Sequence, residues 1–350
     1  MKSGNKTSSV QGELASVEAG GAKQPGNVVG LWRRAVASRT FGILTALIAL
    51  MVLISLVSST FTNIGNLMDI TRQMTLLGLL TIGLTLVLIS GQVDLSMGSV
   101  FGLSGVVAAL ILVSGGGLIL AFGAALLVGV VAGLVNGILS AYLGLPSFIV
   151  TLGTLQVMAG IALLLTDGAP IGLFRVEAPG LEVFYYASQA RVFGVPLQFL
   201  YLIGIAIIFS IIINRTTFGL RAYASGGSGR AARLSGVKVA QVQTTAFVVS
   251  GVLSAIAGLL GLGFIQSVHA NAGQDMVFPV FAAAVLGGAS LFGGEGRISG
   301  ALVGAALLSV LNNGLIHLDV SAFTQILING LVVIIAVGVN RFVAIRRGAA

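Results

Sequence analysis

Long apolar runs separated by short polar segments make up most of the chain after about residue 40. A helix needs roughly 20 apolar residues to cross the hydrocarbon core of a bilayer. The pattern predicts an all-α polytopic membrane protein with ten spans, at residues 41–60, 73–90, 97–113, 118–141, 147–166, 199–214, 244–265, 278–290, 298–316 and 323–341. The eighth of these, at residues 278–290, is short and ends in glycines, so it is a half-helix, a re-entrant segment or a full crossing.

The N-terminal segment differs from everything that follows it. Residues 1–30 are rich in Gly, Ser and Lys and almost free of large apolar side chains, so they cannot bury enough apolar surface to fold. The first apolar run begins too late and is too long for a cleaved signal peptide. We predict a disordered cytoplasmic tail over residues 1–39, followed by one transmembrane domain over residues 40–345.

The composition supports the membrane assignment. Of the 350 residues, 56% are hydrophobic and only 8% are charged, whereas about 25% are charged in an ordinary soluble protein. The 50 glycines lie mostly inside the apolar runs, as they do in closely packed membrane helices. Together these values exclude a soluble globular enzyme, a coiled coil, a collagen-like chain and a disordered protein.

The distribution of basic residues gives the direction of the spans. Ten crossings place both termini on one side, and 15 of the 18 Lys and Arg fall on that side. The opposite side holds only Arg72, Arg175 and Arg191. Because Lys and Arg concentrate in cytoplasmic loops, both termini are expected in the cytoplasm, and the net charge of +8 reflects topology rather than nucleic-acid binding. The 15 residues are Lys2, Lys6, Lys23, Arg33, Arg34, Arg39, Arg215, Arg221, Arg230, Arg233, Lys238, Arg297, Arg341, Arg346 and Arg347.

The predicted spans almost lack the residues that enzymes and coupled carriers use. The chain has no cysteine, and His269 and His317 are too isolated to suggest a metal site. No Gly-x-x-x-x-Gly-Lys-Ser/Thr sequence is present, so the chain cannot hydrolyse ATP alone. A proton- or sodium-coupled carrier needs ionisable groups within its helices, and we expect none there. We therefore predict no catalytic residue, no metal and no cofactor in this chain, and an energy source outside it.

A polar break separates the second and third spans, with the sequence SGQVDLSMGS over residues 90–99. Asp94 and Ser96 are suited to cap the following helix, because their oxygens can accept hydrogen bonds from its free N–H groups. The alternative is a functional role, in which Gln92, Asp94 and Ser96 line a translocation path or form its gate.

The loop of residues 215–243 carries five basic residues and no acidic one. Ser228 is a good N-cap, Ala231 and Ala232 favour helix, and Gly236 is a natural helix stop. The pattern predicts a helix of about two turns, which alone would be marginal in water and which is suited to dock into a groove on a partner. A loop that only fixes topology is the alternative. The candidate docking residues are Ser228, Arg230, Ala231, Ala232, Arg233, Leu234, Ser235 and Gly236.

A glycine-rich segment follows the eighth span, with five glycines among the eleven residues 287–297. This density indicates backbone conformations with positive φ or a very close approach to another segment. The segment is either a tight turn at the inner surface or an element of gating or coupling. Its candidate residues are Gly287, Gly288, Gly293, Gly294, Glu295 and Arg297.

Two adjacent amides, Asn312 and Asn313, lie inside the ninth span. Amides within hydrocarbon must find hydrogen-bonding partners on neighbouring helices. We interpret the pair either as interhelical fastening or as a contact with a polar solute in the translocation path.

These segments resemble the permease subunits of bacterial ABC importers for monosaccharides. That group covers ribose, xylose, arabinose and galactose systems and includes autoinducer-2 permeases. The resemblance spans about residues 40–340. The matching sequences occur in the family's order and are SGQVDLSMGS (90–99), FGLRAYASGG (218–227), ARLSGV (232–237), AAAVLGGASLFGGEGRISG (282–300) and LNNGL (311–315).

The resemblance implies a complex in the bacterial inner membrane. Its expected members are a second permease copy (the same chain or a paralogue), a cytoplasmic ABC ATPase that binds ATP and magnesium, and a periplasmic substrate-binding protein. The helix at 228–236 would be the coupling helix that meets the ATPase. The chain departs from the family here, because Ser228 and Gly229 replace the usual Asn and Glu, which removes one polar contact.

Three other functions fit the same architecture. ABC permeases for nucleosides or branched-chain amino acids would differ from a sugar permease only in their solute. A stand-alone solute carrier would transport without an ATPase, and a purely structural membrane scaffold would show no ATP-linked uptake.

Overall fold

The computed structural model describes residues 39–346, with side chains described from 41 to 338. The predicted tail over residues 1–39 lies outside this range except for its last residue. Each of the ten predicted spans contains a helix. These are α3 (Arg39–Val57), α4 (Ile64–Ile89), α5 (Met97–Val113), α6 (Leu118–Gly137), α7 (Ser147–Thr166), α9 (Leu197–Arg215), α12 (Val239–Ile265), α13 (Val277–Leu286), α14 (Ile298–His317) and α15 (Ala322–Arg346).

Among the described residues, six helices are each long and apolar enough to cross a membrane: α4, α6 with its π-helical extension, α7, α9, α12 and α14. Helices α3, α5, α13 and α15 are apolar but contain shorter qualifying stretches. The chain is therefore an all-α polytopic membrane protein.

The remaining elements are short and lie at the two ends of the long helices. Strands β1 and β4 pair antiparallel, with Ile171 opposite Val268, and so join the segment after α7 to the segment after α12. Strands β2 and β3 form a second antiparallel pair. The short elements are η2 (Ile138–Tyr142), β1 (Ile171–Gly172), α8 (Leu181–Gln189), β2 (Arg191–Val192), β3 (Val195–Pro196), α10 (Thr217–Gly227), α11 (Gly229–Leu234), β4 (Ser267–Val268) and η3 (Gln274–Met276).

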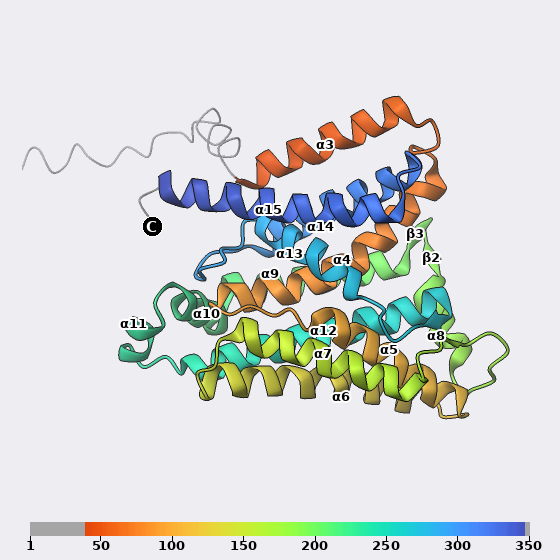
Figure 1. The fold of residues 1–350 in the computed structure, drawn as a ribbon, viewed down its shortest axis with the longest axis horizontal. Helices are drawn as coiled ribbons and strands as arrows, with labels where there is room; N and C mark the ends of the chain where they lie inside the picture. Colours follow the sequence, from red (N-terminus) through yellow and green to blue (C-terminus); the bar gives the residue numbers. More distant parts are fainter. Residues whose placement is uncertain (1–38, 347–350) are drawn as a thin grey trace, which may run out of the picture.

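Helix α4 is the centre of the molecule (Figure 1). Every residue from Leu77 to Ile89 is buried, as expected for a helix that is apolar on all sides. In its most apolar stretch 78% of residues are buried, whereas in α9 the share is 22%. Helices α6, α7 and α9 therefore present apolar faces to the surroundings, which is the arrangement that a lipid solvent requires.

Helices α6 and α12 pack closely because one face of α6 lacks side chains. Gly129, Gly133 and Gly137 follow one another at intervals of four residues. A Cβ at Gly133 would lie 2.5 Å from the Phe247 backbone oxygen, and one at Gly137 would lie 2.6 Å from Thr244 Cγ2. This small-residue stripe lets the two backbones approach, as in membrane helix pairs generally.

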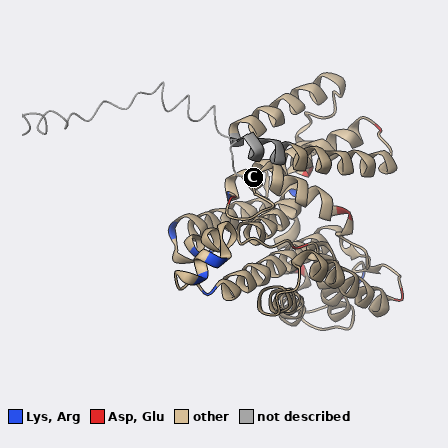
Figure 2. Cartoon of the chain, turned by 60° about the vertical axis from the view of Figure 1, so that its left-hand side comes forward, with Lys and Arg blue, Asp and Glu red and all other residues tan. Residues whose placement is uncertain are grey.

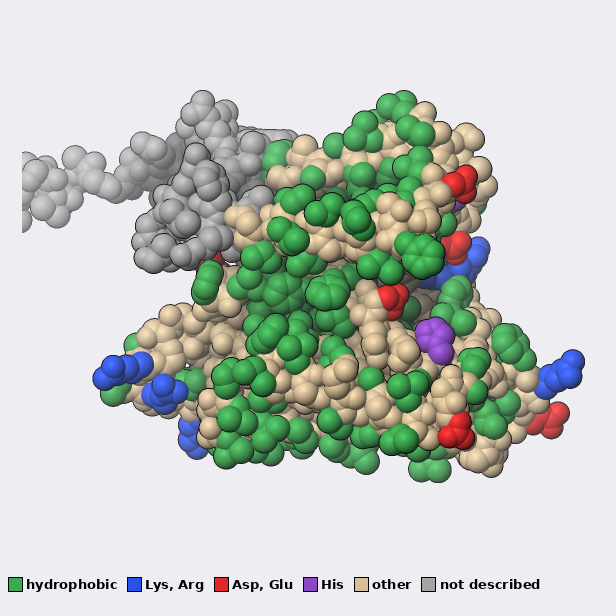
Figure 3. Space-filling view, in the orientation of Figure 1, with side chains coloured by type: hydrophobic (Ala, Val, Ile, Leu, Met, Phe, Trp, Pro, Cys, Tyr) green, Lys and Arg blue, Asp and Glu red, His purple; other side chains and the backbone are tan. Residues whose placement is uncertain are grey.

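The two ends of the molecule differ in charge. The start of α3, the end of α15, α10 and α11 lie at one end, and α8, β2 and β3 lie at the other (Figure 1). Lys and Arg gather at the end that holds α10 and α11 (Figure 2). Between the ends, the surface is covered largely by hydrophobic side chains (Figure 3). The molecule thus has an apolar belt with a basic end, as a membrane orientation requires.

Helix α4 begins at Ile64, earlier than the predicted span at 73, because Asn63 caps it by accepting a hydrogen bond from Gly65 N–H. Asp69 and Arg72 lie in this N-terminal extension of α4, outside the predicted span of residues 73–90. Arg72 Nη1 lies 2.7 Å from Asp69 Oδ1, and the Arg72 guanidinium lies 4.7 Å from the centre of the Phe264 ring. The ion pair and the ring contact reduce the cost of placing these charges near hydrocarbon.

The length of helix α13 distinguishes a half-helix from a full-length helix at the eighth span. It has 10 residues, about 15 Å of helix, which is half of a hydrocarbon core of about 30 Å. The segment before it packs against the first turns of α5, since a Cβ at Gly98 would overlap the backbone oxygen of Gly273 and one at Gly102 would lie 2.6 Å from that of Ala272. The eighth span thus contains a helix of half the length of a crossing, which the 3₁₀ turn η3 precedes and which an irregular segment connects to β4.

Candidate functional site

The break between α4 and α5 contains a buried carboxylate with hydroxyl partners. Asp94 Oδ1 accepts hydrogen bonds from Ser96 N–H at 2.9 Å and from Ser96 Oγ at 2.6 Å. Asp94 Oδ2 accepts from Ser250 Oγ of α12 at 2.8 Å. All three side chains are buried, so the carboxylate ties the broken segment to the middle of α12.

The same network reaches two further helices. Ser96 Oγ accepts from Asn136 Nδ2 of α6 at 2.8 Å, and Asn136 Oδ1 accepts from Thr154 Oγ1 of α7 at 2.6 Å. The predicted capping role is wrong, because the Ser96 side chain makes no capping bond to α5 and the N–H that Asp94 binds belongs to Ser96, which precedes the helix. Gln92 is half-buried, and its backbone N–H donates to Val87 O at 3.1 Å.

The short helix predicted in the basic loop is present as α11. Ser228 Oγ accepts from Ala231 N–H at 3.4 Å. At the other end Gly236, with φ of 81°, donates to Arg233 O, and Val237 N–H donates to Ala232 O, both at 3.0 Å. This pair of bonds around a left-handed glycine is a Schellman stop, so both predicted ends of the helix are confirmed.

The face that α11 presents is defined by burial. Ala232 is buried, whereas Arg230, Ala231, Arg233 and Leu234 are exposed, and Leu234 is 86% exposed. The exposed face of α11 therefore combines one leucine with two arginines. The two alanines therefore differ in exposure, because Ala231 faces outward and Ala232 packs inward.

Helix α10 precedes α11 and was not predicted from the sequence. Its signal was the recurrence of small residues at Gly219, Ala222 and Ser225, which are its buried positions and follow helical spacing.

The end of α10 contacts the α4–α5 break and the glycine-rich turn through glycine backbone atoms, with no side chain between the segments. We call this contact of Gly91, Gly226, Gly293 and Gly294 the glycine joint. A Cβ at Gly226 would lie 2.5 Å from Gly294 N and 3.0 Å from Gly91 N, and would also overlap the oxygen of Ile89. Gly294 N–H donates to Ile89 O at 3.0 Å. Three segments far apart in the sequence are thus held at backbone contact distance.

Side chains reinforce the glycine joint. Tyr223 of α10 donates its hydroxyl to Gly296 O at 2.7 Å, and Gln243 Nε2 of α12 donates to Ser90 O at 3.1 Å. Burial raises the pKa of Tyr223, an effect that the charge of Arg297 partly offsets, so the phenol keeps the proton that it donates. Among the other predicted turn residues, Gly287 packs on the backbone of Gly300 at the start of α14.

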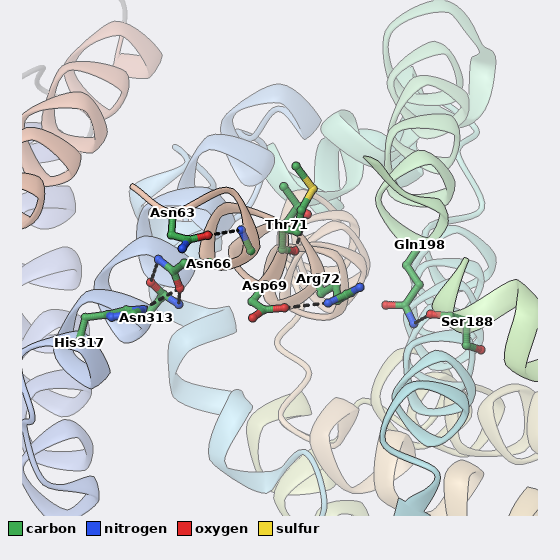
Figure 4. A network of polar contacts seen from close by, with 11 residues as sticks. Asn63, Asn66, Asp69, Thr71, Arg72, Ser188, Gln198, Asn313 and His317 are labelled. Atoms are coloured by element: carbon green, nitrogen blue, oxygen red, sulfur yellow. Dashed lines mark hydrogen bonds and ion pairs between the residues drawn. The ribbon is translucent and has the colours of Figure 1, made fainter. Parts of the chain in front are cut away.

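The two adjacent amides of α14 have different surroundings. Asn313 is buried and exchanges two hydrogen bonds with Asn66 of α4, at 3.0 and 2.8 Å. His317 Nε2 lies 2.8 Å from Asn66 Oδ1, and its Nδ1 lies 3.1 Å from Thr60 Oγ1. These side chains converge from α4 and α14 (Figure 4). Asn313 therefore fastens two helices, whereas Asn312 lines a cavity.

That cavity has a volume of about 1000 Å³ and lies between α4, η3, α13, α14 and α15. Its apolar walls include Leu76, Phe278 and Ile326. Within the described part of the chain, Asp275 is the one charged residue that lines it. The polar lining residues are Gln73, Gln274, Asp275, Ser309, Asn312, Gln325 and Asn329.

A second hollow, of about 640 Å³, lies over residues 176–183 and Tyr185 at the opposite end from α11. Glu177 and Glu182 line it, and Glu182 lies in the first turn of α8. Close to it Phe174, Val183 and Tyr186 are exposed. This end of the molecule therefore offers acidic and apolar side chains together. No group of three His, Cys, Asp or Glu that could hold a metal ion occurs among the residues with described structure.

Residues 66–337 match the family described as branched-chain amino acid transport system / permease component. This match covers most of the chain and includes every candidate segment described above. The chain belongs to this permease family.

Several named members of the family are similar over nearly their whole length. The ribose import permease protein RbsC of Bacillus subtilis (strain 168) is 35% identical over 295 residues, which are 84% of this chain and 90% of that protein. The autoinducer 2 import system permease protein LsrC of Photorhabdus luminescens is 35% identical, over 83% of this chain and 87% of that protein. The L-arabinose transport system permease protein AraH of Escherichia coli (strain K12) is 33% identical, over 86% and 90%.

A solved structure titled "An inward-facing conformation of a putative metal-chelate type ABC transporter" aligns with 87% of this chain and 99% of that chain. Its TM-score is 0.44 and its sequence identity is 16%. This likeness is too distant to assign function.

Proposed function

We propose that this chain is the membrane-spanning permease subunit of an ATP-binding-cassette importer for a monosaccharide or a similar small polar solute. The observation that carries this proposal is the similarity, over more than four-fifths of the chain, to permeases named for ribose and arabinose import. The apolar belt and the cavity with polar lining support it, because a path for such a solute needs hydrogen-bonding groups inside an apolar envelope.

The protein crosses the bacterial inner membrane ten times, with both termini in the cytoplasm. The end that holds α10 and α11 is the cytoplasmic one, as the 15 basic residues predicted on that side support. The end that holds α8 faces the periplasm. The half-helix α13 and the irregular segment before it together make one crossing.

Coupling to the ATPase occurs through α11, with Arg230, Ala231, Arg233 and Leu234 as its contact face. Ser228 and Gly236 fix the two ends of the helix. ATP and magnesium are bound by the partner, and this chain holds no cofactor and has no ATPase activity of its own. The glycine joint connects α10 to α4 and to the α13–α14 turn, so a displacement of α11 reaches helices that line the cavity.

Two further partners complete the complex. A second permease copy, identical or paralogous, forms the other half of the path. A periplasmic binding protein delivers the solute at the end of the molecule that carries Glu177, Glu182 and the exposed Tyr186. Exposed Arg175 and Arg191 lie at the same end, so this surface suits a partner that carries charges of both signs.

The predicted path residues act in different ways in this proposal. Asn312 belongs to the wall of the path. Asn313 holds α14 against α4, two helices that line the path. Asp94 and Ser96 hold the α4–α5 break against α12 and α6, which lie behind it. Gln92 lies at the inner end of the α4–α5 break, next to the glycine joint, and serves the gate there.

Branched-chain amino acid transport is the second candidate, because the family description names it. An amino acid carries a carboxylate that is usually bound by a basic side chain or by free backbone N–H groups. The cavity has no basic residue among its described lining, which favours a neutral solute.

The test is uptake of radiolabelled solutes by membrane vesicles that contain the permease with its ATPase and binding protein. D-Ribose, L-arabinose, a nucleoside and leucine are compared at equal concentration. Uptake of a sugar above the others is the expected result. Uptake of leucine with no uptake of any sugar would contradict the monosaccharide assignment.

A further inference from the structure

Three oxygen atoms in the wall of the cavity are buried and have no hydrogen-bonding partner. They are Ser309 Oγ and Asn312 Oδ1 of α14 and Asn329 Oδ1 of α15, and all three residues line the cavity. Buried polar groups in folded proteins are nearly always paired, so an unpaired one needs an explanation. Eight buried side-chain atoms of the described residues lack a partner, and three of them lie around this one cavity, which indicates a missing partner there.

The positions of these residues place them where a solute arrives from outside. Asn312 lies five residues before His317, at the end of α14 opposite to the glycine-rich turn. Asn329 lies in the third turn of α15, counted from the same end. Gln73, in the first half of α4, lines the same space. The unpaired oxygens therefore lie in the outer half of the membrane-spanning region.

The chemistry of the lining selects among solutes. Two amide oxygens can only accept hydrogen bonds, and the serine hydroxyl can accept as well as donate. Their natural partner is a molecule that carries several O–H donors. Asp275 is the one charged side chain among the described lining residues, and it repels anions. Exposed Phe278 offers an apolar ring to the C–H face of such a molecule.

We infer that Ser309, Asn312 and Asn329 form a binding subsite for the hydroxyl groups of a neutral polyhydroxylated solute, and that this subsite discriminates against phosphorylated or carboxylated ones. The inference rests on the proposed function and adds to it the contact residues and the rejection of anions. In the present conformation the three oxygens are shielded from solvent. They meet the solute when α14 and α15 move apart during transport.

Adjacent Asn312 and Asn313 supply a matched pair of variants. Asn312→Leu removes an unpaired oxygen at nearly constant volume, so the thermal stability of the complex stays the same or rises. Asn313→Leu removes two hydrogen bonds and leaves buried Asn66 without them, so stability falls. Solute-specific loss of transport is expected only for Asn312→Leu and for Asn329→Leu.

The first measurement is ATP-driven uptake of D-ribose by vesicles that contain the complete complex, with saturating binding protein. Asn312→Leu and Asn329→Leu should each lower the maximum rate about tenfold, the effect of one lost hydrogen bond. The concentration of binding protein that gives half the maximum rate should not change. An unchanged maximum rate in the double variant would overturn the subsite. Loss of association between permease copies would also overturn it, because the oxygens would then be partnered by the second copy.

The second measurement does not depend on transport and uses the absence of cysteine from the sequence. An Asn329→Cys variant is labelled with a small cationic thiol reagent in the assembled complex. D-Ribose should slow the labelling several-fold, and ribose 5-phosphate should not. A Ser59→Cys variant in the exposed loop between α3 and α4 is the control, with labelling unaffected by either compound. Equal protection by both compounds, or by neither, would contradict the inference. If wild-type vesicles transport no sugar at all, the proposed function itself fails, whatever the labelling shows.

Discussion

Replacing Gly226 by alanine should uncouple ATP hydrolysis from transport. The added Cβ would lie 2.5 Å from Gly294 N and 3.0 Å from Gly91 N, whereas ordinary contacts are about 3.5 Å. The glycine-rich turn must therefore withdraw by about 1 Å, which breaks the 3.0 Å hydrogen bond from Gly294 N–H to Ile89 O. Overpacking of this kind costs about 1–3 kcal/mol, and the lost hydrogen bond adds about 1 kcal/mol.

A cost of about 2–4 kcal/mol corresponds to roughly a thirtyfold to thousandfold change in an equilibrium between two conformations. Because the strain falls on the contact between α10 and the helix ends that it moves, we expect sugar uptake to fall at least tenfold. The contact face of α11 is untouched, so the ATPase should still bind and hydrolyse ATP.

Gly227 provides the matched control, because a Cβ there would meet no atom within 4 Å. Gly227→Ala should transport like the wild type. The assay compares ATP hydrolysis and D-ribose uptake in the same vesicles for both variants. Equal uptake by Gly226→Ala and Gly227→Ala would refute the role of the glycine joint.

Three further outcomes are expected. Leu234→Asp should reduce co-purification of the ATPase at least tenfold, while the permease still inserts into the membrane. Ala232→Glu should instead perturb the fold of the loop, because Ala232 is buried. Normal assembly of the Leu234→Asp variant would place the ATPase contact elsewhere. Tyr223→Phe leaves Gly296 O without its 2.7 Å partner and should lower uptake a few-fold, through the loss of about 1 kcal/mol, measured against wild-type vesicles of equal protein content. The purified permease alone should hydrolyse no ATP, and hydrolysis that survives removal of contaminating ATPases would contradict the assignment.

The sequence was sufficient where short-range physics decides the structure. The ten apolar runs, and the ends of α11 at Ser228 and Gly236, follow from local composition and capping. The sequence does not predict the early start of α4, because the charged residues Asp69 and Arg72 are typical of a loop. Their ion pair becomes visible only in the structure.

The sequence could not predict which residues contact each other across long stretches of the chain. No local sequence pattern indicates that Asp94 forms a hydrogen bond with Ser250, more than 150 residues away. Nor does any local pattern indicate that Asn313 forms hydrogen bonds with Asn66 while Asn312 Oδ1 has no partner. The same holds for the glycine joint, whose segments are distant in the chain. The sequence indicates that these residues are unusual, and only the packing of the helices shows which of them join helices and which line a cavity.

The central claim is that this chain forms the path of an ATP-driven importer and supplies no energy itself. The most direct measurement is D-ribose accumulation in vesicles that contain the permease and its ATPase, with binding protein on the outer side and ATP on the inner side. Accumulation should require ATP and should vanish when the phosphate-binding lysine of the ATPase is replaced. Accumulation by vesicles that contain the permease alone would contradict the account and identify a stand-alone carrier.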